Sequence, residues 1–359
     1  MLLNKCVGIV GAGIVGLLIA EKFHSRGWQV SVFEKDFMEE SAHCSRVSAG
    51  MLAPCSELEK AEGLIGHLGK ASLKLWDDIV KERMLTVSYR REGSLVLAHS
   101  CDDAELQHFK KRVDNFDLEA SVYLDRSAIE QFNPNFPSTF QRGLFLSNEG
   151  SLDNEALMEE LGKRLKESGV VFHYGSCVEK ILPYTIKTSN DEHRFSWVID
   201  CRGLGGKDSF DNLRGVRGEI LKVHAPEVNF PIPIRFLHPR FPIYVVPREE
   251  NHYLIGATLI ESQSEKSITV RSILELLSAA YSLNPHFAEA NIVETSVGLR
   301  PAFPDNIPKI FCEDGLVAVN GLYRHGFLLS PILAQGVADY CENKRVSLPE
   351  TIFREASCV

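Results

Sequence analysis

The first 34 residues constrain the fold most, because they place three regularly spaced glycines between two apolar runs. Cys6 to Val10 reads as a short buried strand, and Trp28 to Phe33 reads as a second one. Between them, Ile14 to Arg26 has the pattern of a helix, with Gly27 placed to stop it. The sequence therefore predicts a strand–helix–strand unit at the start of the chain.

The GAGIVG motif inside this unit is typical of a turn that binds the pyrophosphate of a dinucleotide. Gly11 suits the tight turn, Gly13 lets the backbone approach the phosphates, and Gly16 allows close contact between helix and strand. The helix N-terminus then faces the phosphates. Glu34, 18 residues beyond Gly16, can accept the ribose hydroxyls and would repel the 2′-phosphate of NADP. We predict a dinucleotide site; a glycine-rich packing turn is the alternative.

NAD and FAD share this fingerprint, and three later stretches favour FAD. Residues 45–54, SRVSAGMLAP, are small or hydroxylated and suit the wall of a flat ring. Residues 195–206, FSWVIDCRGLGG, read as a strand that opens onto a glycine-rich turn. Residues 316–340, LVAVNGLYRHGFLLSPILAQGVADY, read as a strand, a basic turn and a long apolar helix. The N-terminus of such a helix can stabilise the negative charge of a reduced flavin.

Composition excludes several other classes of protein. The chain has 359 residues, 44% of them hydrophobic, which is enough for a large core and two lobes. Its net charge of −9 argues against a nucleic-acid partner. The nine scattered cysteines form no Cys-x-x-Cys pair, which indicates free thiols in a reducing compartment and no metal site. The apolar N-terminal run is too short to span a bilayer, so we expect a cytoplasmic protein without a signal peptide or a stable membrane anchor.

Taken together, the motifs resemble those of the glycine oxidases of thiamine biosynthesis (ThiO type), within the D-amino-acid oxidase and sarcosine oxidase family. The matching stretches run from Gly11 to Pro331 and are GAGIVG with Glu34, SAGMLAP, DCRGLGG, RGEIL, HPRFPIYVVPR, YLIGATLIES, GLRPAFPDNIP and NGLYRHGFLLSP. The resemblance implies a mixed α/β and α+β fold. A Rossmann-type FAD-binding lobe would be built from the discontinuous segments 1–88, 143–215 and 296–359. A substrate lobe with a mainly antiparallel sheet would comprise 89–142 and 216–295.

The hydrophobic patterns are compatible with that division. The expected strands are Tyr89–Ala98, Arg217–His224, Ile243–Val246 and Tyr253–Thr258, and the expected helices are Asn154–Ser168 and Thr269–Leu283. No long helix separates the strands between residues 217 and 258, which favours antiparallel pairing over further βαβ units.

The resemblance also implies a set of FAD-binding residues drawn from several stretches. They are Gly11, Gly13, Ile14, Val15, Gly16, Glu34, Lys35, Ser45, Ser48, Ala49, Gly50, Met51, Val178, Arg202, Gly203, Arg324, His325, Gly326, Phe327 and Leu328. Some sarcosine oxidases attach flavin covalently to a cysteine or histidine, but the surroundings of Cys312 do not match that pattern. Non-covalent FAD is therefore expected.

Arg300, in VGLRPAFPDN, is the candidate for binding the substrate. A guanidinium in an apolar setting needs an anion, either an internal carboxylate or a ligand. The resemblance implies that Arg300 and Tyr244 grip the substrate carboxylate, with Met51 also in the substrate site and Arg324 beside the ring or the carboxylate. His325 is interpreted as orienting, with a general base at His238 or His325 as the alternative. Pro242 and Leu259 depart from residues found in some relatives and leave the pocket shape open.

The implied activity is oxidative deamination of glycine, with sarcosine or small D-amino acids as further substrates. Hydride transfer to flavin N5 would yield an imine, then glyoxylate and ammonia, with dioxygen reduced to hydrogen peroxide. The imine would supply thiazole synthesis, so the partners would be an amino acid, dioxygen and the enzymes of that pathway. Relatives form dimers and tetramers, so a homo-oligomer is compatible with the resemblance. The alternatives are a D-amino-acid or secondary-amine dehydrogenase that uses another electron acceptor, the oxidative domain of a tRNA-modifying enzyme, and a non-catalytic nucleotide-binding protein.

Overall fold

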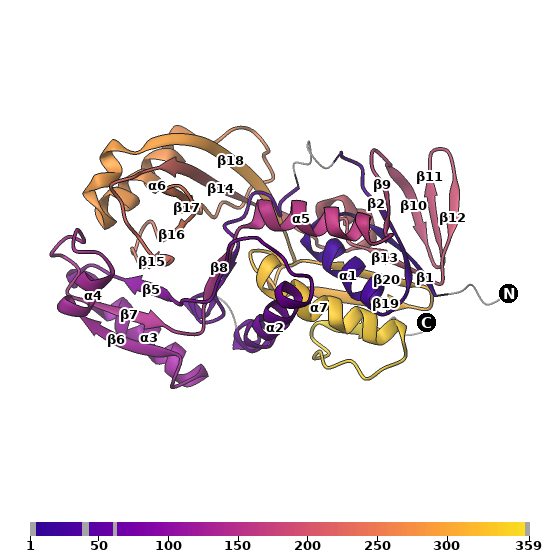
Figure 1. Cartoon of the computed structure of the whole chain (residues 1–359), viewed down its shortest axis with the longest axis horizontal. Coiled ribbons are helices and arrows are strands. Elements are labelled where there is room, and N and C mark those ends of the chain that lie inside the picture. The colour runs from indigo at the N-terminus through magenta and orange to yellow at the C-terminus, as the bar shows by residue number, and fades with distance from the viewer. Residues whose placement is uncertain (1–4, 38–42, 60–62, 356–359) are drawn as a thin grey trace.

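Two lobes, each built on its own β-sheet, make up the computed structural model, which describes residues 5–37, 43–59 and 63–355 (Figure 1). The first lobe contains a seven-stranded sheet and the second an eight-stranded sheet. Strands β3 (Met51–Leu52), β8 (Gly150–Leu152) and β4 (Tyr89–Arg90) form a small sheet where the lobes meet. The mixed α/β and α+β fold is confirmed.

The seven-stranded sheet begins with the predicted strand–helix–strand unit. Neighbouring strands of this sheet are parallel, except for the antiparallel pair of β19 and β20. In spatial order its strands are β21 (Phe353–Glu355), β19 (Lys309–Glu313), β20 (Leu316–Asn320), β13 (Trp197–Asp200), β1 (Cys6–Val10), β2 (Gln29–Phe33) and β9 (Val171–His173). The central strand β1 is almost wholly apolar, as expected for a strand of a parallel sheet that is covered on both faces.

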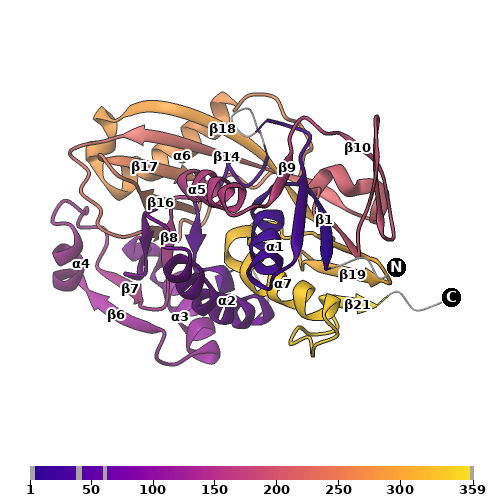
Figure 2. The same ribbon diagram turned by 45° about the vertical axis from the view of Figure 1, so that its right-hand side comes forward.

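Helices cover one face of this sheet and a second sheet covers the other. The helices are α1 (Ile14–Ser25), α2 (Gly63–Glu82), α5 (Asn154–Glu167) and α7 (Gly326–Cys341), which share one hydrophobic core with the sheet (Figure 2). The covering sheet consists of β10 (Val178–Leu182), β11 (Thr185–Thr188) and β12 (Glu192–Arg194). The 3₁₀ helices η1 (Ser56–Glu59) and η3 (Gly203–Ser209) lie on the connections of this lobe.

The eight-stranded sheet of the second lobe is antiparallel except between β15 and β5. Its strands, in order, are β18 (Asn291–Ala302), β14 (Arg214–His224), β17 (His252–Gly256), β16 (Ile243–Pro247), β15 (Ile234–Phe236), β5 (Ser94–Leu97), β7 (Arg142–Leu146) and β6 (Ser121–Asp125). Helices α4 (Arg126–Phe132) and α6 (Val270–Leu283) pack in one core, and α3 (Asp103–Phe116) packs in another. The connections carry the 3₁₀ helices η2 (Ser100–Asp102) and η4 (Pro285–Glu289).

Most expected elements are confirmed, with small shifts at their ends. The prediction of a single strand over Tyr89–Ala98 is wrong, because β4 and β5 belong to different sheets. Extended backbone is interrupted between them at Gly93, whose φ is +87°. The strand expected to reach Thr258 ends at Gly256. The expected division into lobes stays a prediction, and three strands of the eight-stranded sheet, β7, β14 and β18, run across its limits at 142/143, 215/216 and 295/296.

Within the described ranges, no helix is both long enough and apolar enough to cross a membrane. Over the same ranges, none of the cysteines is joined in a disulfide.

Trp76 fastens α2 to the start of α7. Its side chain is fully buried, and its indole Nε1 donates to the carbonyl of Phe327 at 2.8 Å. We expect Trp76→Ala to lower the free energy of unfolding by about 3–5 kcal/mol, because it removes a large core side chain and leaves a cavity. Urea denaturation followed by circular dichroism measures the change.

The matched control is Leu118→Ala, since the side chain of Leu118 is 78% exposed. Its effect should stay within about 0.5 kcal/mol. Equal losses in the two variants would show that Trp76 does not hold α7.

Candidate functional site

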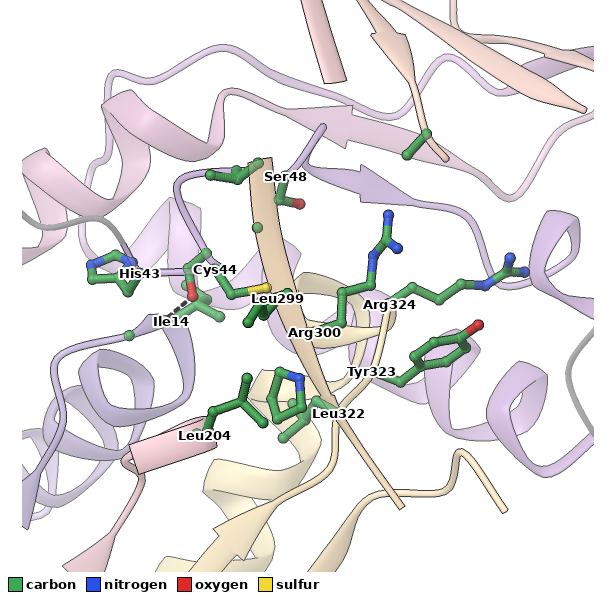
Figure 3. Close-up of a pocket in the computed structure, with 18 of the residues that line it drawn as sticks. Ile14, His43, Cys44, Ser48, Leu204, Leu299, Arg300, Leu322, Tyr323 and Arg324 are labelled. Atoms are coloured by element: carbon green, nitrogen blue, oxygen red, sulfur yellow. Dashed lines mark hydrogen bonds between the residues drawn. The ribbon is translucent and has the colours of Figure 1, made fainter. Parts of the chain in front are cut away.

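A cavity of about 1170 Å³ lies between the two lobes (Figure 3). Its walls include the glycine turn after β1 and the start of α7 from the first lobe, together with strands β14, β15, β16 and β18 from the second. The nucleotide end and the substrate end expected from the sequence are therefore parts of one continuous space.

The glycine turn is shaped by two close backbone approaches. Gly11 has a φ of +102°, and a Cβ there would lie 2.7 Å from the carbonyl oxygen of Cys201. A Cβ on Gly16 would collide with the carbonyl of Gly11, so α1 packs directly on the turn. Any side chain at either position would push the helix away from the strand.

Glu34 holds the same turn from the end of β2. Its Oε2 accepts from the amide of Ala12 at 2.7 Å, and its Oε1 accepts from the amide of Asp36 at 3.2 Å. The side chain lines the cavity while remaining largely buried. A carboxylate oxygen can accept more than one hydrogen bond, so the predicted contact with ribose hydroxyls is compatible with these bonds.

The segment 45–49 is attached to both lobes. Ser45 Oγ accepts from the amide of Ile14 at the start of α1, at 3.1 Å (Figure 3). Asn154 Nδ2 donates to the carbonyl of Arg46 at 2.9 Å, and Arg248 Nη2 donates to the carbonyl of Ala49 at the same distance. Burial lowers the pKa of Arg248. These bonds fix the wall that was expected to face a flat ring.

The N-terminus of α7 opens onto the cavity. Gly326, Phe327 and Leu328 line it, and the first turn of the helix carries no acidic residue. Its positive end is therefore not neutralised by its own side chains. A reduced flavin, which carries negative charge, would be stabilised there.

Arg300 projects from β18 into the substrate end of the cavity. Its Nη1 donates to the carbonyls of Thr258, at 3.1 Å, and Arg217, at 3.4 Å. In the part of the chain that the structure describes, no carboxylate lies within ion-pair distance of this guanidinium. The alternative that Arg300 serves an internal aspartate or glutamate thus finds no support among those residues.

Tyr244 on β16 pairs with Gly256 on the neighbouring strand β17. A Cβ at Gly256 would come within 2.9 Å of the Tyr244 hydroxyl. Burial raises the pKa of Tyr244, while the charge of Arg300 acts in the opposite direction. The hydroxyl therefore stays protonated at neutral pH and can donate to an anion.

Arg324, by contrast, has an anionic partner. Its Nε and Nη2 lie 2.8 and 2.7 Å from Oε2 of Glu57. His325 Nδ1 is 3.3 Å from the same oxygen but makes no hydrogen bond to it. Burial favours the neutral form of Glu57, yet Arg324 and His325 outweigh it and hold the pKa of this carboxyl well below its usual range.

A second ion pair stands beside this one. Arg235 Nε donates to Oε2 of Glu59 at 3.0 Å, and Arg235 lines the cavity. Sequence reasoning missed Glu57, Glu59 and Arg235. The only available signal was SELE directly after the expected ring wall, and two glutamates on a short loop do not by themselves indicate a site.

Most predicted site residues meet at the cavity wall. They are Gly11, Gly13, Ile14, Val15, Glu34, Lys35, Ser45, Ser48, Ala49, Met51, Val178, Arg202, Gly203, Tyr244, Arg300, Arg324, Gly326, Phe327 and Leu328. Gly16, Gly50 and His325 are not in the wall. Gly16 lies under the turn, Gly50 packs on Leu152, and His325 is buried at the start of α7.

Other residues named from the sequence can also be placed. Pro242 and Leu259 line the cavity. Nδ1 of His238 accepts from the amides of Arg240 and Phe241, which indicates a role in the turn rather than as a base. Cys312 is buried in the core of the first lobe, away from the wall. Among the described residues, no group of three or more histidine, cysteine or acidic side chains could hold a metal ion.

The glycine turn, the acidic end of β2 and the long cavity define a dinucleotide-dependent enzyme of two lobes. The chain belongs to the FAD dependent oxidoreductase (DAO) family, whose sequence profile matches residues 6–340. Its cofactor is therefore FAD, and the residues of the nucleotide end fit that group: Gly13, Ile14 and Val15 at the N-terminus of α1 line the cavity, and the first turn of this helix carries no acidic residue.

Several relatives are similar over nearly the whole chain. The relative from Rhizobium etli, whose name assigns it to thiamine biosynthesis as the oxidoreductase ThiO, is 39% identical over 91% of this chain and 94% of its own length. The glycine oxidase of Geobacillus kaustophilus is 24% identical over 95% of this chain. Its crystal structure has a TM-score of 0.85 and covers 97% of both chains. A bifunctional ThiO/ThiG protein of Nostoc is 27% identical, and this chain spans 52% of it.

Glu149 is a buried carboxyl behind the segment that carries Glu57. It is fully buried, and it accepts from the amide of Ser56 at 2.5 Å, from the hydroxyl of Ser56 at 2.7 Å and from the hydroxyl of Ser94. Burial raises the pKa of Glu149 to about 7, against the effect of these hydrogen bonds. Ser56 in the cavity wall is thus hydrogen-bonded to a carboxyl group with a pKa near neutrality.

This shift makes stability depend on pH. The folded state favours the neutral form of Glu149. The contribution of Glu149 to stability is therefore fully present below its ordinary pKa of 4.5, and it is lost as the pH rises through about 7. We expect the free energy of unfolding of the protein, relative to Glu149→Gln, to fall by about 3 kcal/mol between pH 4.5 and 7. Denaturant titrations of both proteins across this window measure it.

Glu313→Gln, at an exposed position on β19, is the control. If Glu149→Gln and Glu313→Gln both follow the pH curve of the unaltered protein, Glu149 does not titrate in this window.

Proposed function

We propose that this chain is an FAD-dependent oxidase of glycine, with sarcosine and small D-amino acids as further substrates. The observation that carries the proposal is the guanidinium of Arg300, which faces the cavity without a carboxylate partner among the described residues. A small amino acid supplies the missing anion. The names of the relatives from Rhizobium etli and Geobacillus kaustophilus support the same substrate and pathway.

The residues of the substrate end bind and orient. The fork of Arg300 takes the carboxylate, and the protonated hydroxyl of Tyr244 donates to it. Two contacts on one carboxylate fix the direction of the α-carbon, which lowers the entropic part of the barrier. Bound FAD would supply the acceptor for a hydride from that carbon, and dioxygen would then take up the two electrons, with two protons, as hydrogen peroxide.

The other charged groups near Tyr244 are already paired and leave Arg300 as the anchor. Glu57 is held by Arg324, and Glu59 by Arg235. Because Arg324 and His325 hold the pKa of Glu57 low, its carboxylate is a poor base at neutral pH. The proposed chemistry accordingly needs an amine that is neutral when it reacts, and no proton acceptor from the wall.

The product would pass to the enzymes that build the thiazole ring of thiamine. The protein of Nostoc joins a ThiO part and a ThiG part in one chain, which supports close coupling of the two steps. A cytoplasmic location fits cysteines that form no disulfide across the described ranges.

A spectrum recorded without oxygen tests the reaction directly. We expect the oxidised flavin bands to bleach when glycine is added, and to return with formation of hydrogen peroxide when air is admitted. Bleaching with glycine but recovery only with a dye would identify a dehydrogenase instead. A flavin that stays oxidised in glycine, sarcosine and D-alanine would contradict the proposed substrates.

Arg300→Ala should weaken the binding of glycine by about 2–5 kcal/mol, because it removes one partner of a buried charge pair. Arg300→Lys should recover little, since an ammonium lacks the planar fork. The KM for glycine and the inhibition constant of acetate, a carboxylate without an amine, measure the loss.

Arg194→Ala, at a residue 74% exposed on β12, is the control and should leave both constants unchanged. Unaltered constants in Arg300→Ala would assign this arginine a purely structural role.

A further inference from the structure

A buried ion pair on β14 lies next to the cavity but outside its wall. Arg217 and Glu219 are 4% and 0% exposed, and Nη2 of the arginine lies 2.6 Å from Oε1 of the glutamate. Burying two charges costs about as much as their attraction returns, so such a pair is weak evidence for stability alone. Its position suggests what else it does.

The pair and Arg300 lie on opposite faces of the same sheet. Successive side chains of a strand alternate, so Arg217 and Glu219 point to one face and Gly218 to the other. A Cβ on Gly218 would collide with Cζ and both terminal nitrogens of Arg300. The guanidinium therefore lies against the bare backbone of Gly218, on the opposite face of β14 from the buried pair.

Thr258 connects the two faces. Its hydroxyl donates to Oε2 of Glu219 at 2.9 Å and accepts from the Glu219 amide at 3.0 Å. Its carbonyl accepts from Nη1 of Arg300 at 3.1 Å. The carbonyl of Arg217 accepts from the same nitrogen at 3.4 Å. Both carbonyls that hold Arg300 thus belong to residues fixed by Glu219.

The side chain of Arg217 fastens the loop that follows Thr258. Its Nη1 donates to the carbonyls of Ser264, at 2.5 Å, and Lys266, at 2.6 Å, and its Nη2 donates to that of Ser267 at 2.9 Å. Burial raises the pKa of Glu219, but hydrogen bonds, including those from Ser272, Arg217 and Thr258, outweigh it and lower that pKa. The glutamate therefore stays charged and keeps its donors in place.

We propose that Glu219, Arg217 and Thr258 are positioning residues that hold the guanidinium of Arg300 against Gly218 and aim its fork into the cavity. This inference rests on the proposed function, in which Arg300 binds the substrate carboxylate. It gives a role to two stretches singled out in the sequence, RGEIL (217–221) and YLIGATLIES (253–262). A substrate as small as glycine offers few other contacts, so the direction of one fork decides where its α-carbon lies.

Thr258→Val and Thr258→Ser form the matched test. Valine keeps the shape of threonine but loses the hydroxyl that bonds Glu219, whereas serine keeps it. We expect Thr258→Val to raise both the KM for glycine and the inhibition constant of acetate about tenfold, and Thr258→Ser to change them less than about twofold. FAD content, measured from the visible absorbance, should be the same in both. A merely structural role would lower stability and FAD content together and leave the affinity for acetate unchanged.

Gly218→Ala tests the other side of the same arrangement without touching the buried pair. Its methyl group should displace the guanidinium and raise the inhibition constant of acetate about tenfold or more. Gly63→Ala is the control, because a Cβ at Gly63 meets no atom within 4 Å. Unchanged acetate affinity in both Thr258→Val and Gly218→Ala would overturn the proposal while leaving glycine oxidation intact.

A failure of the proposed function would look different. The unaltered protein would then not oxidise glycine, and crystal structures of Thr258→Val and Gly218→Ala would still test the positioning. Movement of the Arg300 guanidinium away from the carbonyls of residues 217 and 258 would support it, and an unmoved guanidinium would refute it.

Discussion

The site depends on a guanidinium whose charge no carboxylate among the described residues balances. Among the arginines whose charges act on Tyr244, two are neutralised by glutamates: Arg235 by Glu59 and Arg324 by Glu57. Arg300 instead bonds two carbonyls, which fix its direction without cancelling its charge. An unpaired charge in a half-buried wall favours an anionic ligand at that point. The charges of the paired arginines are already balanced by glutamates, so they attract an anion less strongly than Arg300 does.

The two lobes need one another to make this site. Segment 45–49 belongs to the first lobe by its contact with α1, yet Arg248 from the second lobe holds its carbonyl at Ala49. The start of α7 is held by Trp76 of α2 and opens toward strands of the second lobe. Direct hydrogen bonds therefore fix the distance between segment 45–49, the expected ring wall, and the strands of the second lobe that carry the substrate end. That spacing is what places a small substrate over a flat cofactor.

Local patterns predicted the elements well where a single rule decided them. The GAGIVG turn, the helix after it and the antiparallel strands between residues 217 and 256 follow from glycine spacing and alternation, and they are found as expected. The single strand predicted from Tyr89 to Ala98 is wrong because its two halves, the charged YRRE and the apolar SLVLA, join different sheets. The positive φ of Gly93 interrupts the strand between them, and the choice of partner strand is made by the tertiary structure.

By itself the sequence determined the dinucleotide-binding turn, the order of the elements and the arginine that requires an anion, since each depends on residue type and spacing within a short window. Only the tertiary structure decided which arginines find partners. Glu57, Glu59 and Glu219 are ordinary glutamates in the sequence, and it is long-range packing that brings two of them to guanidiniums more than 150 residues away and leaves Arg300 with none among the described residues. Charge pairing depends on distances of a few ångströms across the folded chain, and no local pattern encodes them.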